Sequence, residues 1–378
     1  MTTYAHLAPE QRELLERAET LAANKLAALA AAGERGRINR PLLRALADEG
    51  LLERLFSADG PGSAVDLCLV REGLARYCTE AETAFAIQGL GANPILRAAR
   101  PEVLEEWVPR LVSGEAAAAF ALTEPGAGSD VASIALRAER DGDGYRLTGT
   151  KVYISNAPDA EVYSVFARTT DGAGSRGLTA FAVARDSDGL SGEHLTLVAP
   201  HPIGRLDFEG VFVAATHVLG EVDDGFRVAM ETLDFFRPSV GAFALGMGQA
   251  ALDAAVEHAR SREAFGRPLR DFQAVSHQLA EAATRLQAAR LLVFHAAAAH
   301  DAGVRPVTEA SAMAKLFATE TAQHVVDVAI QVHGARALEE GHILEHLYRE
   351  VRAPRIYEGA SEVQREIIAR QLFRGAEA

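Results

Sequence analysis

The chain of 378 residues is 48% hydrophobic and 24% charged, which is typical of a globular protein and unlike a disordered or membrane-embedded chain. Its formal net charge of −14 argues against a nucleic-acid partner, because phosphate binding needs clustered Lys and Arg. The two cysteines, Cys68 and Cys78, suit neither a disulfide framework nor a zinc site. Since no signal peptide and no apolar run of membrane-spanning length is evident, we expect a cytoplasmic protein without a membrane partner.

Hydrophobic periodicity divides the chain into three regions. Residues 1–118 are predicted to be helical, because leucines in "PLLRALADEGLLERLF" recur at spacings of three and four. Residues 119–217 contain short β-branched and aromatic segments, such as "EVYSVFART" and "GLTAFAVAR", and predict an antiparallel β-barrel or sandwich. Residues 218–378 contain long Ala-rich stretches whose small residues favour a helical bundle. The predicted class is α+β, in the order α, β, α.

The stretch "ALTEPGAGSD", from Ala121 to Asp130, lies where the helical pattern gives way to strands. Its glycines let backbone amides approach a ligand, and a turn with exposed amides and hydroxyls suits a phosphate or the edge of a flavin. The alternative is a tight surface turn. The stretch does not match the dinucleotide fingerprint G-x-G-x-x-G.

Two later stretches carry similar alternatives. "SREAFGRPLRDFQ" joins two long helical patterns, and its arginines could grip a pyrophosphate while Phe265 packs on an aromatic ring. The turn residues alone favour a plain helix–helix connection with solvated arginines. "QVHGARALEEG" places Gly334 at the end of an apolar helix, where a glycine is often only a stop signal.

The stretch "EEGHILEH" contains an H-x-x-E-H pattern formed by His342, Glu345 and His346. On a helix this spacing would bring two imidazoles to one face, as in some zinc peptidases. The pattern is short and lacks a third ligand, so no metal site is predicted.

Near the end of the chain, "RIYEGASEVQRE" holds an acid, Glu358, between Tyr357 and Gly359. Ser361 followed by Gln364 is a capping-box pattern, which predicts a helix from about Glu362. A carboxylate at this place can be a partner of the helix dipole, and the local pattern alone favours that role over a catalytic base.

Taken together, the order and separation of these stretches resemble the acyl-CoA dehydrogenase family. The shared segments are "ALTEPGAGSD", "KVYISNA", "SREAFGRPLRDFQ", "QVHGARAL" and "YREVRAPRIYEGASEVQRE". The likeness covers nearly the whole chain. It implies an N-terminal helical domain, a middle β domain, a C-terminal four-helix bundle, FAD as cofactor, and a homo-oligomer, either dimer or tetramer.

The resemblance also implies which residues bind FAD. Tyr153 takes the place of a Trp or Phe against the isoalloxazine ring, and Ser155 that of the residue bonding toward flavin N5. The implied contacts to the FAD of the same subunit are Phe120, Leu122, Thr123, Gly128, Ser129, Tyr153, Ile154, Ser155, Ala360 and Glu362. The residues implied to reach the FAD of a neighbouring subunit are Arg262, Phe265, Gln273, Gln331, Gly334 and Ala335.

For the reaction, the resemblance implies that Glu358 is the base that removes a proton α to a thioester carbonyl, while a hydride passes to flavin N5. Other branches of the family carry the base directly before the Arg of "LDFFRP", which is Phe236 here and cannot accept a proton. The implied substrate-binding residues are Ser129, Asp234, Phe236, Arg237 and Gly359. The expected substrate is a short, medium or branched acyl-CoA, or an acyl-carrier-protein thioester, and the expected electron partner is an electron-transfer flavoprotein.

Four departures from the family pattern are visible. Ala360 replaces a usual Thr, Ala335 replaces a usual Gly, and the stretch "APHPIGRLDFEGV", which in the family lies near the pantetheine arm, is contracted. Glu82 occupies the place of an Arg in glutaryl-specific members, which argues against a dicarboxylate substrate. The alternatives are a flavin oxidase or monooxygenase on the same scaffold, a catalytically silent homologue, and a nucleic-acid-binding relative, the last disfavoured by the acidic charge.

Overall fold

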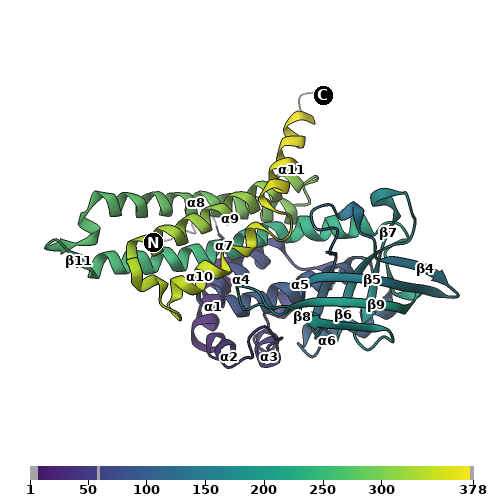
Figure 1. The fold of residues 1–378 in the computed structure, drawn as a ribbon. Coiled ribbons are helices and arrows are strands. Elements are labelled where there is room, and N and C mark those ends of the chain that lie inside the picture. The colour runs from purple at the N-terminus through teal and green to yellow at the C-terminus, as the bar shows by residue number, and fades with distance from the viewer. Residues whose placement is uncertain (1–6, 58–59, 375–378) are drawn as a thin grey trace. The chain divides into compact units, whose positions relative to one another are not determined.

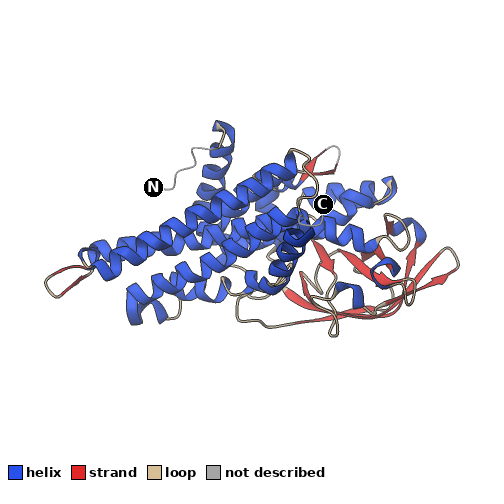
Figure 2. Cartoon of the chain, turned by 90° about the horizontal axis from the view of Figure 1, so that it is seen from above, coloured by secondary structure: helices blue, strands red, loops and turns tan. Residues whose placement is uncertain are grey.

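A computed structural model of the chain describes residues 7–57 and 60–374. Within these residues the chain forms two compact units, each assembled from separate stretches of sequence. Of the described residues, the helical unit comprises 7–27, 64–82 and 234–374, and the sheet unit comprises 28–57, 60–63 and 83–233. The mixture of helices and strands confirms the predicted α+β class and its order (Figures 1 and 2). The three predicted domain boundaries stay predictions.

The helical unit is built mainly from long helices. These are α1 (Pro9–Leu21) with a π-helical continuation (Ala22–Leu26), α4 (Ala64–Tyr77), most of α7 (Gly225–Ser261), α8 (Gln273–Asp301), α9 (Thr308–His333), α10 (Ile343–Glu350) and α11 (Ser361–Arg374). Short 3₁₀ turns lie at Gly334–Leu338 and Ala353–Arg355. A small hairpin of β11 (Glu263–Ala264) and β12 (Arg267–Pro268), followed by a 3₁₀ turn (Leu269–Asp271), joins α7 to α8 (Figure 1).

Glycines on α7 let this helix lie close against α8 and α9. A Cβ added at Gly241 would lie 2.7 Å from Cγ2 of Val293 on α8 and 3.3 Å from Cβ of Ala318 on α9. One added at Gly248 would lie 2.9 Å from Cδ1 of Leu286 on α8. Because packed interiors leave no room for an extra methyl group, these approaches require glycine. The small residues therefore serve the close helix packing expected from the sequence.

By length and composition, α7 is the one helix within residues 7–57 and 60–374 that could cross a membrane, with a mean hydropathy of 1.2 over its most apolar window. The expectation that no apolar stretch is long enough was therefore wrong. Of this window, 78% is buried inside the protein. The core helix of a globular protein passes the same length and composition test, so this is weak evidence for a membrane span.

The sheet unit contains eight strands in one sheet, with the order β10-β7-β6-β4-β5-β9-β8 and β3 paired to β6. The strands are β3 (Ala118–Ala121), β4 (Arg137–Asp141), β5 (Gly144–Ser155), β6 (Val162–Arg168), β7 (Leu178–Ala184), β8 (Leu190–His194), β9 (Ile203–Ala214) and β10 (Val218–Leu219). The predicted strand segments match β5, β6, β7 and β9. Most pairs are antiparallel as predicted, but β3 and β4 each pair in parallel with β6.

Helices α3 (Arg40–Asp48), α5 (Thr79–Ala98, of which Thr83 onward belongs here) and α6 (Pro101–Val112) complete the sheet unit, with a short strand pair, β1 (Phe56–Ser57) and β2 (Gly60–Pro61), that the helical prediction missed. Helix α5 touches β3 directly, since a Cβ at Gly91 would lie 2.5 Å from the backbone nitrogen of Ala119. The buried side chain of Gln88 accepts from Ala118 N at 3.0 Å and donates to Leu111 O and Ala116 O at 2.8 Å each. These contacts fix the first residues of β3, the strand from which the loop at Leu122 begins.

Strand β5 is irregular at its end. Its register against β9 shifts between Lys151 and Ile154, which is the mark of a β-bulge. Two residues around the bulge have left-handed backbones, Tyr153 with φ 56° and Asn156 with φ 65°. Such angles are costly outside glycine and usually occur where a side chain must be aimed in a particular direction.

Candidate active site

The loop after β3 is a tight turn with an open outer face. Glu124 and Ala127 exchange backbone hydrogen bonds at 3.0 and 3.1 Å, which closes the turn. Gly126, Gly128 and Ser129 are exposed, and a Cβ added at either glycine would meet nothing within 4 Å. The turn therefore presents exposed backbone and a hydroxyl on a rigid frame, which suits contact with a bulky anionic ligand.

A buried ion pair that the sequence analysis missed holds this loop against β5. Lys151, fully buried, donates from Nζ to Glu124 Oε1 and to Leu122 O, both at 2.8 Å. Glu124 Oε2 accepts from Ala135 N at 2.6 Å, and Oε1 accepts also from Leu136 N at 3.0 Å. Burial lowers the pKa of Lys151 to about 8, against the opposing pull of Glu124. The Lys151–Glu124 ion pair thus anchors the loop to β5 on its buried side, while the glycines on its outer face stay exposed.

The loop and the end of β5 lie side by side. Val152 N donates to Thr123 O at 3.0 Å, and Asn156 Nδ2 donates to Ala118 O at 2.9 Å. Tyr153 is 60% exposed, whereas Ile154 is buried. The structure thus brings together the two predicted FAD-binding segments, the first being Phe120, Leu122, Thr123, Gly128 and Ser129 and the second Tyr153, Ile154 and Ser155.

These segments fit an FAD molecule by their chemistry. The exposed aromatic ring of Tyr153 offers a face for stacking. Its left-handed backbone is a strained conformation of the kind that is common at ligand-binding sites. The glycine turn offers unencumbered backbone for a pyrophosphate.

In the helical unit, Glu358 lies on a strained turn between the 3₁₀ turn at Ala353–Arg355 and α11. Its backbone φ is +52°, and that of Gly359 is +96°. Side chains from three helices hold the two carbonyls of this turn. Arg237 Nε donates to Glu358 O at 3.2 Å, Lys315 Nζ donates to Gly359 O at 2.7 Å, and Gln364 Nε2 donates to both, at 3.2 and 3.0 Å. This support is what keeps an acidic residue in a left-handed conformation.

The predicted capping box at this helix is wrong. Helix α11 begins at Ser361, and Gln364 N donates to the carbonyl of Ala360 at 3.0 Å, so the capping position is an alanine without a hydroxyl. Ser361 Oγ donates instead to Glu320 at 2.6 Å, and the Gln364 amide points back to the turn. The Gln364 side chain thus bonds to the turn at Glu358 and Gly359, and that of Ser361 to α9, rather than to the first amides of the helix.

The carboxylate of Glu358 is held without a close partner. Its Oε2 is buried and has no hydrogen-bond partner among residues 7–57 and 60–374. Burial raises the pKa of Glu358, while the charges of Arg71, Lys315 and Arg237 oppose the rise. Lys315, in turn, is fully buried, and burial lowers its pKa to about 8. Desolvation therefore outweighs three nearby cations, which leaves a carboxylate prepared to accept a proton.

Behind Glu358 lies a second buried acid. Glu82 Oε1 accepts from Arg71 Nε in a very short contact, and Arg71 Nη1 donates to Ser239 Oγ at 2.7 Å. Burial raises the pKa of Glu82 to about 7, against the pull of Arg71 and with the help of the Glu358 charge. Arg71 had no signal in the sequence, because a helix as buried as α4 shows no charged face on which to place it.

The predicted substrate residues on α7 belong to the same neighbourhood of the helical unit. Asp234 Oδ1 accepts from Arg237 Nη1 at 2.6 Å and Oδ2 from Thr308 Oγ1 at 2.6 Å, so this acid orients the arginine that bonds to the Glu358 carbonyl. Phe236 is fully buried against Phe235. Gly359 lies on the turn itself, whereas Ser129 lies in the sheet unit, and Ala360 and the exposed Glu362 begin α11.

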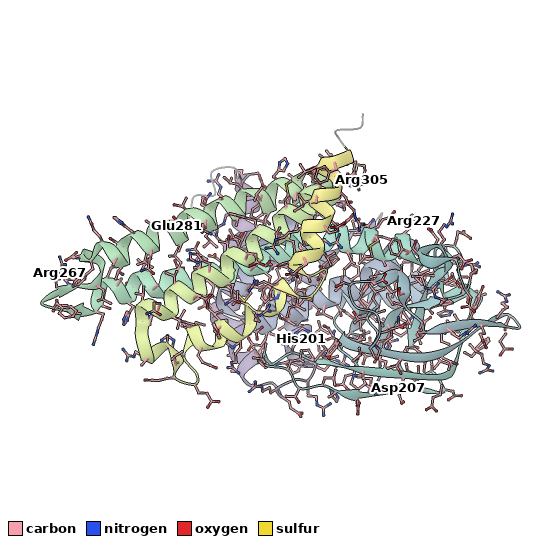
Figure 3. All side chains as sticks on the ribbon, turned by 45° about the horizontal axis from the view of Figure 1, so that its top comes forward. His201, Asp207, Arg227, Arg267, Glu281 and Arg305 are labelled. Atoms are coloured by element: carbon pink, nitrogen blue, oxygen red, sulfur yellow. The ribbon has the colours of Figure 1, made fainter. Side chains whose placement is uncertain are left out.

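The residues implied to reach a neighbouring subunit are exposed. Phe265, at the tip of the β11–β12 hairpin, is 96% exposed with φ 52° (Figure 3 labels the adjacent Arg267 at this tip). Arg262, Gln273, Gln331, Gly334 and Ala335 are exposed as well, and Gly334 ends α9 with φ 68°. Their exposure suits contacts outside this chain and excludes a role in its core.

The H-x-x-E-H pattern has other roles. His342 caps α10 by accepting from Leu344 N at 3.2 Å, His346 Nε2 lies 2.7 Å from Thr79 Oγ1, and Glu345 pairs with Arg349 at 2.7 Å. Within the described residues, 7–57 and 60–374, no three His, Cys, Asp or Glu side chains form a metal-binding group.

Comparison with known proteins agrees with this geometry. The chain is 36% identical over 348 residues to cyclohexane-1-carbonyl-CoA dehydrogenase of Geobacter metallireducens, covering 90% of this chain and 91% of the relative. It is 42% identical over 285 residues to 3-(aryl)acrylate reductase of Clostridium sporogenes, covering 75% of each. The solved structure of butyryl-CoA dehydrogenase from Megasphaera elsdenii superposes with a TM-score of 0.91 at 33% identity, over 97% of this chain and 99% of that one. A structure described as electron transferring flavoprotein of Acidaminococcus fermentans has a TM-score of 0.92 at 31% identity, over 97% and 99%.

The similar proteins identify the chain as an oxidoreductase that acts on CH–CH bonds, and both the strained turn of the helical unit and the glycine loop of the sheet unit agree with this class. The models of the N-terminal, middle and C-terminal domains of acyl-CoA dehydrogenase match residues 8–115, 119–211 and 223–373. The chain belongs to the acyl-CoA dehydrogenase family. Membership of this flavoprotein family confirms FAD as the cofactor.

Proposed function

We propose that the enzyme oxidises an acyl-CoA to the trans-2-enoyl-CoA, with Glu358 as the base that removes the α-proton. The single observation that carries this proposal is the buried Glu358 Oε2, which lacks a hydrogen-bond partner within the described residues although three cations are near. A carboxylate kept free, desolvated and fixed on a strained turn is suited to accept a proton from carbon. A helix-dipole partner would need none of these features.

Each residue around Glu358 has a proposed task. The raised pKa of Glu358 brings its basicity closer to what proton removal from carbon requires. Arg237, Lys315 and Gln364 hold the turn so that the acid and the Glu358 backbone amide keep their direction, the amide being aimed at the thioester oxygen. When bound, FAD supplies the acceptor for the hydride that leaves the β-carbon, so the substrate loses two electrons and two hydrogens in all.

The similar proteins support particular partners. In cyclohexane-1-carbonyl-CoA, the thioester in the name of one relative, the α-carbon is a member of the ring. This similarity supports a branched or alicyclic acyl-CoA over an acyl-carrier-protein thioester. The similarity to a structure described with electron transferring flavoprotein supports such a flavoprotein as electron partner. A homo-oligomer, dimer or tetramer, is supported by the exposure of Phe265 and its neighbours. A cytoplasmic location is supported by Cys68 and Cys78, both free and buried.

The decisive variant is Glu358→Gln. It keeps the volume of the side chain but cannot accept the α-proton, so reduction of bound FAD by acyl-CoA should slow by at least about 100-fold. FAD content and the binding of a non-reacting thioester should stay the same. The matched control is Glu366→Gln, an exposed acid on α11 outside the site. Wild-type rates in Glu358→Gln would refute the assignment of the base.

The substrate is identified by anaerobic bleaching of the flavin with a panel of straight, branched and alicyclic thioesters, each as acyl-CoA and as acyl-carrier-protein conjugate. Bleaching by the carrier-protein series alone would overturn CoA as carrier. Rapid oxygen consumption by the reduced enzyme would identify an oxidase, and failure of every thioester to bleach bound FAD would support a silent homologue.

A further inference from the structure

The contracted stretch before β9 has a use that the proposed reaction leaves unexplained. It brings His201 against the end of β5, where His201 Nε2 lies 2.7 Å from Ser155 Oγ. The next residue, Pro202, accepts from Asn156 N at 2.7 Å, and Ser155 is paired with Ile203 in the β5–β9 register. The labelled His201 lies where the chain enters β9 (Figure 3). Two backbone contacts, at Pro202 and Ile203, therefore hold the short connection against β5, and the His201 side chain contacts the Ser155 hydroxyl.

The imidazole at this place is neutral. Burial lowers the pKa of His201 to about 4, so the ring carries one N–H donor and one acceptor nitrogen at neutral pH. A serine hydroxyl rotates freely when nothing holds it, and a hydrogen bond to a fixed ring nitrogen removes that freedom. Because the Ser155 hydroxyl makes one hydrogen bond to His201, the direction in which it can make a further hydrogen bond is fixed.

Ser155 follows the bulge that turns Tyr153 outward, on the segment packed against the loop after β3. We propose that His201 is a positioning residue that fixes the Ser155 hydroxyl toward the flavin edge, so that the two residues together set FAD affinity and the reduction potential of bound FAD. This inference rests on the proposed function, since it takes Ser155 as a flavin contact. It makes the contracted stretch part of the cofactor site.

The test compares two amides at position 201. The side-chain amide of Gln reaches the position of the imidazole Nε2, whereas that of Asn reaches only the position of Nδ1. We expect His201→Gln to stay within about 2-fold of wild type in the Kd for FAD. His201→Asn and Ser155→Ala should each raise this Kd by about 3- to 10-fold, the loss expected for one hydrogen bond. Both should shift the reduction potential of bound FAD in the same direction.

The double variant His201→Asn/Ser155→Ala should be no worse than Ser155→Ala alone, because the histidine acts through the serine. The control is His217→Leu, in the sheet unit but outside the site, which should match wild type. The inference is overturned if His201→Asn leaves FAD affinity and potential at the wild-type values, if His201→Gln is as poor as His201→Asn, or if the effects of His201→Asn and Ser155→Ala add.

These measurements separate this inference from the proposed reaction. Affinity and potential are measured without substrate, so they judge His201 even in an enzyme that no thioester bleaches. If thioesters bleach the flavin while His201→Asn has the wild-type Kd for FAD and the wild-type reduction potential, the role proposed for His201 is refuted and the proposed reaction stands.

Discussion

Glu358 combines two unfavourable features, a left-handed backbone and a buried carboxylate oxygen without a hydrogen-bond partner among the described residues. Each costs on the order of 1–3 kcal/mol when nothing compensates it. The three side-chain donors to the carbonyls of the turn support the backbone but leave the carboxylate open. Favourable interactions elsewhere in the helical unit must therefore compensate for this turn.

The pH dependence of the reaction follows from the charges around this acid. A base works only when deprotonated, so kcat should fall as pH drops through the pKa of Glu358, which burial places above its ordinary value of 4.5. Lys315 lowers this pKa by its charge. In Lys315→Met the acid limb of the kcat profile should therefore move to higher pH, with Lys25→Met, an exposed position, as control. An unmoved acid limb in a folded Lys315→Met enzyme contradicts this account.

Removing the acid should also relieve strain. Glu358→Gly replaces a residue at φ +52° with one that tolerates this angle and removes the desolvated carboxylate. We expect the melting temperature to equal or exceed that of wild type while activity is lost. Gly359→Ala is the opposite case, because φ is +96° and the added Cβ would collide with the Gln364 amide, so its melting temperature should fall. A lower melting temperature in Glu358→Gly would show that the turn is not strained.

At the residue scale the sequence indicated the acid but not its supports. The pattern around Glu358 favours a partner of the helix dipole, and only the family resemblance over the whole chain implies a base there. Arg71, Glu124 and Lys151 act across folded distances that no local pattern reports. One available signal was overlooked. The chain has only three lysines, and two of them, Lys151 and Lys315, are fully buried beside predicted site segments. In a chain that otherwise uses arginine, a lysine marks a place where a compact cation is needed.

Among the structural elements, the junction of the β3 loop with β5 depends most on a single interaction. Replacing one partner of the buried Lys151–Glu124 pair leaves the other charge without compensation. We expect Lys151→Met to lower the free energy of unfolding of the sheet unit by about 3–5 kcal/mol and to weaken FAD binding through the loosened loop. Thermal melting and FAD titration measure both.

The matched control is Arg227→Ala, which breaks an exposed ion pair with Glu231 and should change stability by no more than about 1 kcal/mol. The double variant Lys151→Met/Glu124→Leu should recover much of the loss, since neither charge is then buried alone. If Lys151→Met melted like Arg227→Ala, the pair would not hold the loop.

Periodicity predicted the elements better than their ends and their pairing. The four strand segments match β5, β6, β7 and β9, because alternation and turn residues are local signals. The parallel β3–β6 pair and the bulge in β5 are consequences of which strands meet, and the sequence around Tyr153 gives no sign of either. The predicted capping box is wrong for a similar reason, because the Ser361 hydroxyl donates to the Glu320 carboxylate on another helix, α9, which no local pattern reports.

At the scale of the whole molecule, the exposed hairpin between α7 and α8 allows a test of whether the protein forms a homo-oligomer. Phe265 is almost fully exposed, and the family resemblance implies that it reaches the FAD of a neighbouring subunit. We expect Phe265→Ala to weaken FAD binding by about 10-fold, the loss of one aromatic contact and its buried area, with Phe212→Ala on β9 as control. Light scattering should give the mass of a dimer or tetramer. A monomer whose FAD affinity is unchanged by Phe265→Ala would contradict shared cofactor sites.

The motif order predicted the family, and with it the fold and cofactor, more completely than periodicity did. What the sequence did not indicate is that the compact units are discontinuous: Ala64–Glu82, for example, belongs with the C-terminal helices rather than with its neighbours in the chain. Helical periodicity tells which face of Ala64–Tyr77 is apolar, but that helix is buried nearly all round, so no face indicates its partner.

This discontinuity has a consequence for how the protein is made. The sheet unit is complete once Leu233 has been synthesised, whereas the helical unit needs residues up to α11. At about 5–20 residues per second, synthesis from the end of α4 at Tyr77 to the end of α11 at Arg374 takes roughly 15 to 60 s. We expect the apolar side chains of α1 and α4 to lack their native partners on the nascent chain during that time. The turn that carries Glu358 is thus synthesised only after every residue of the sheet unit.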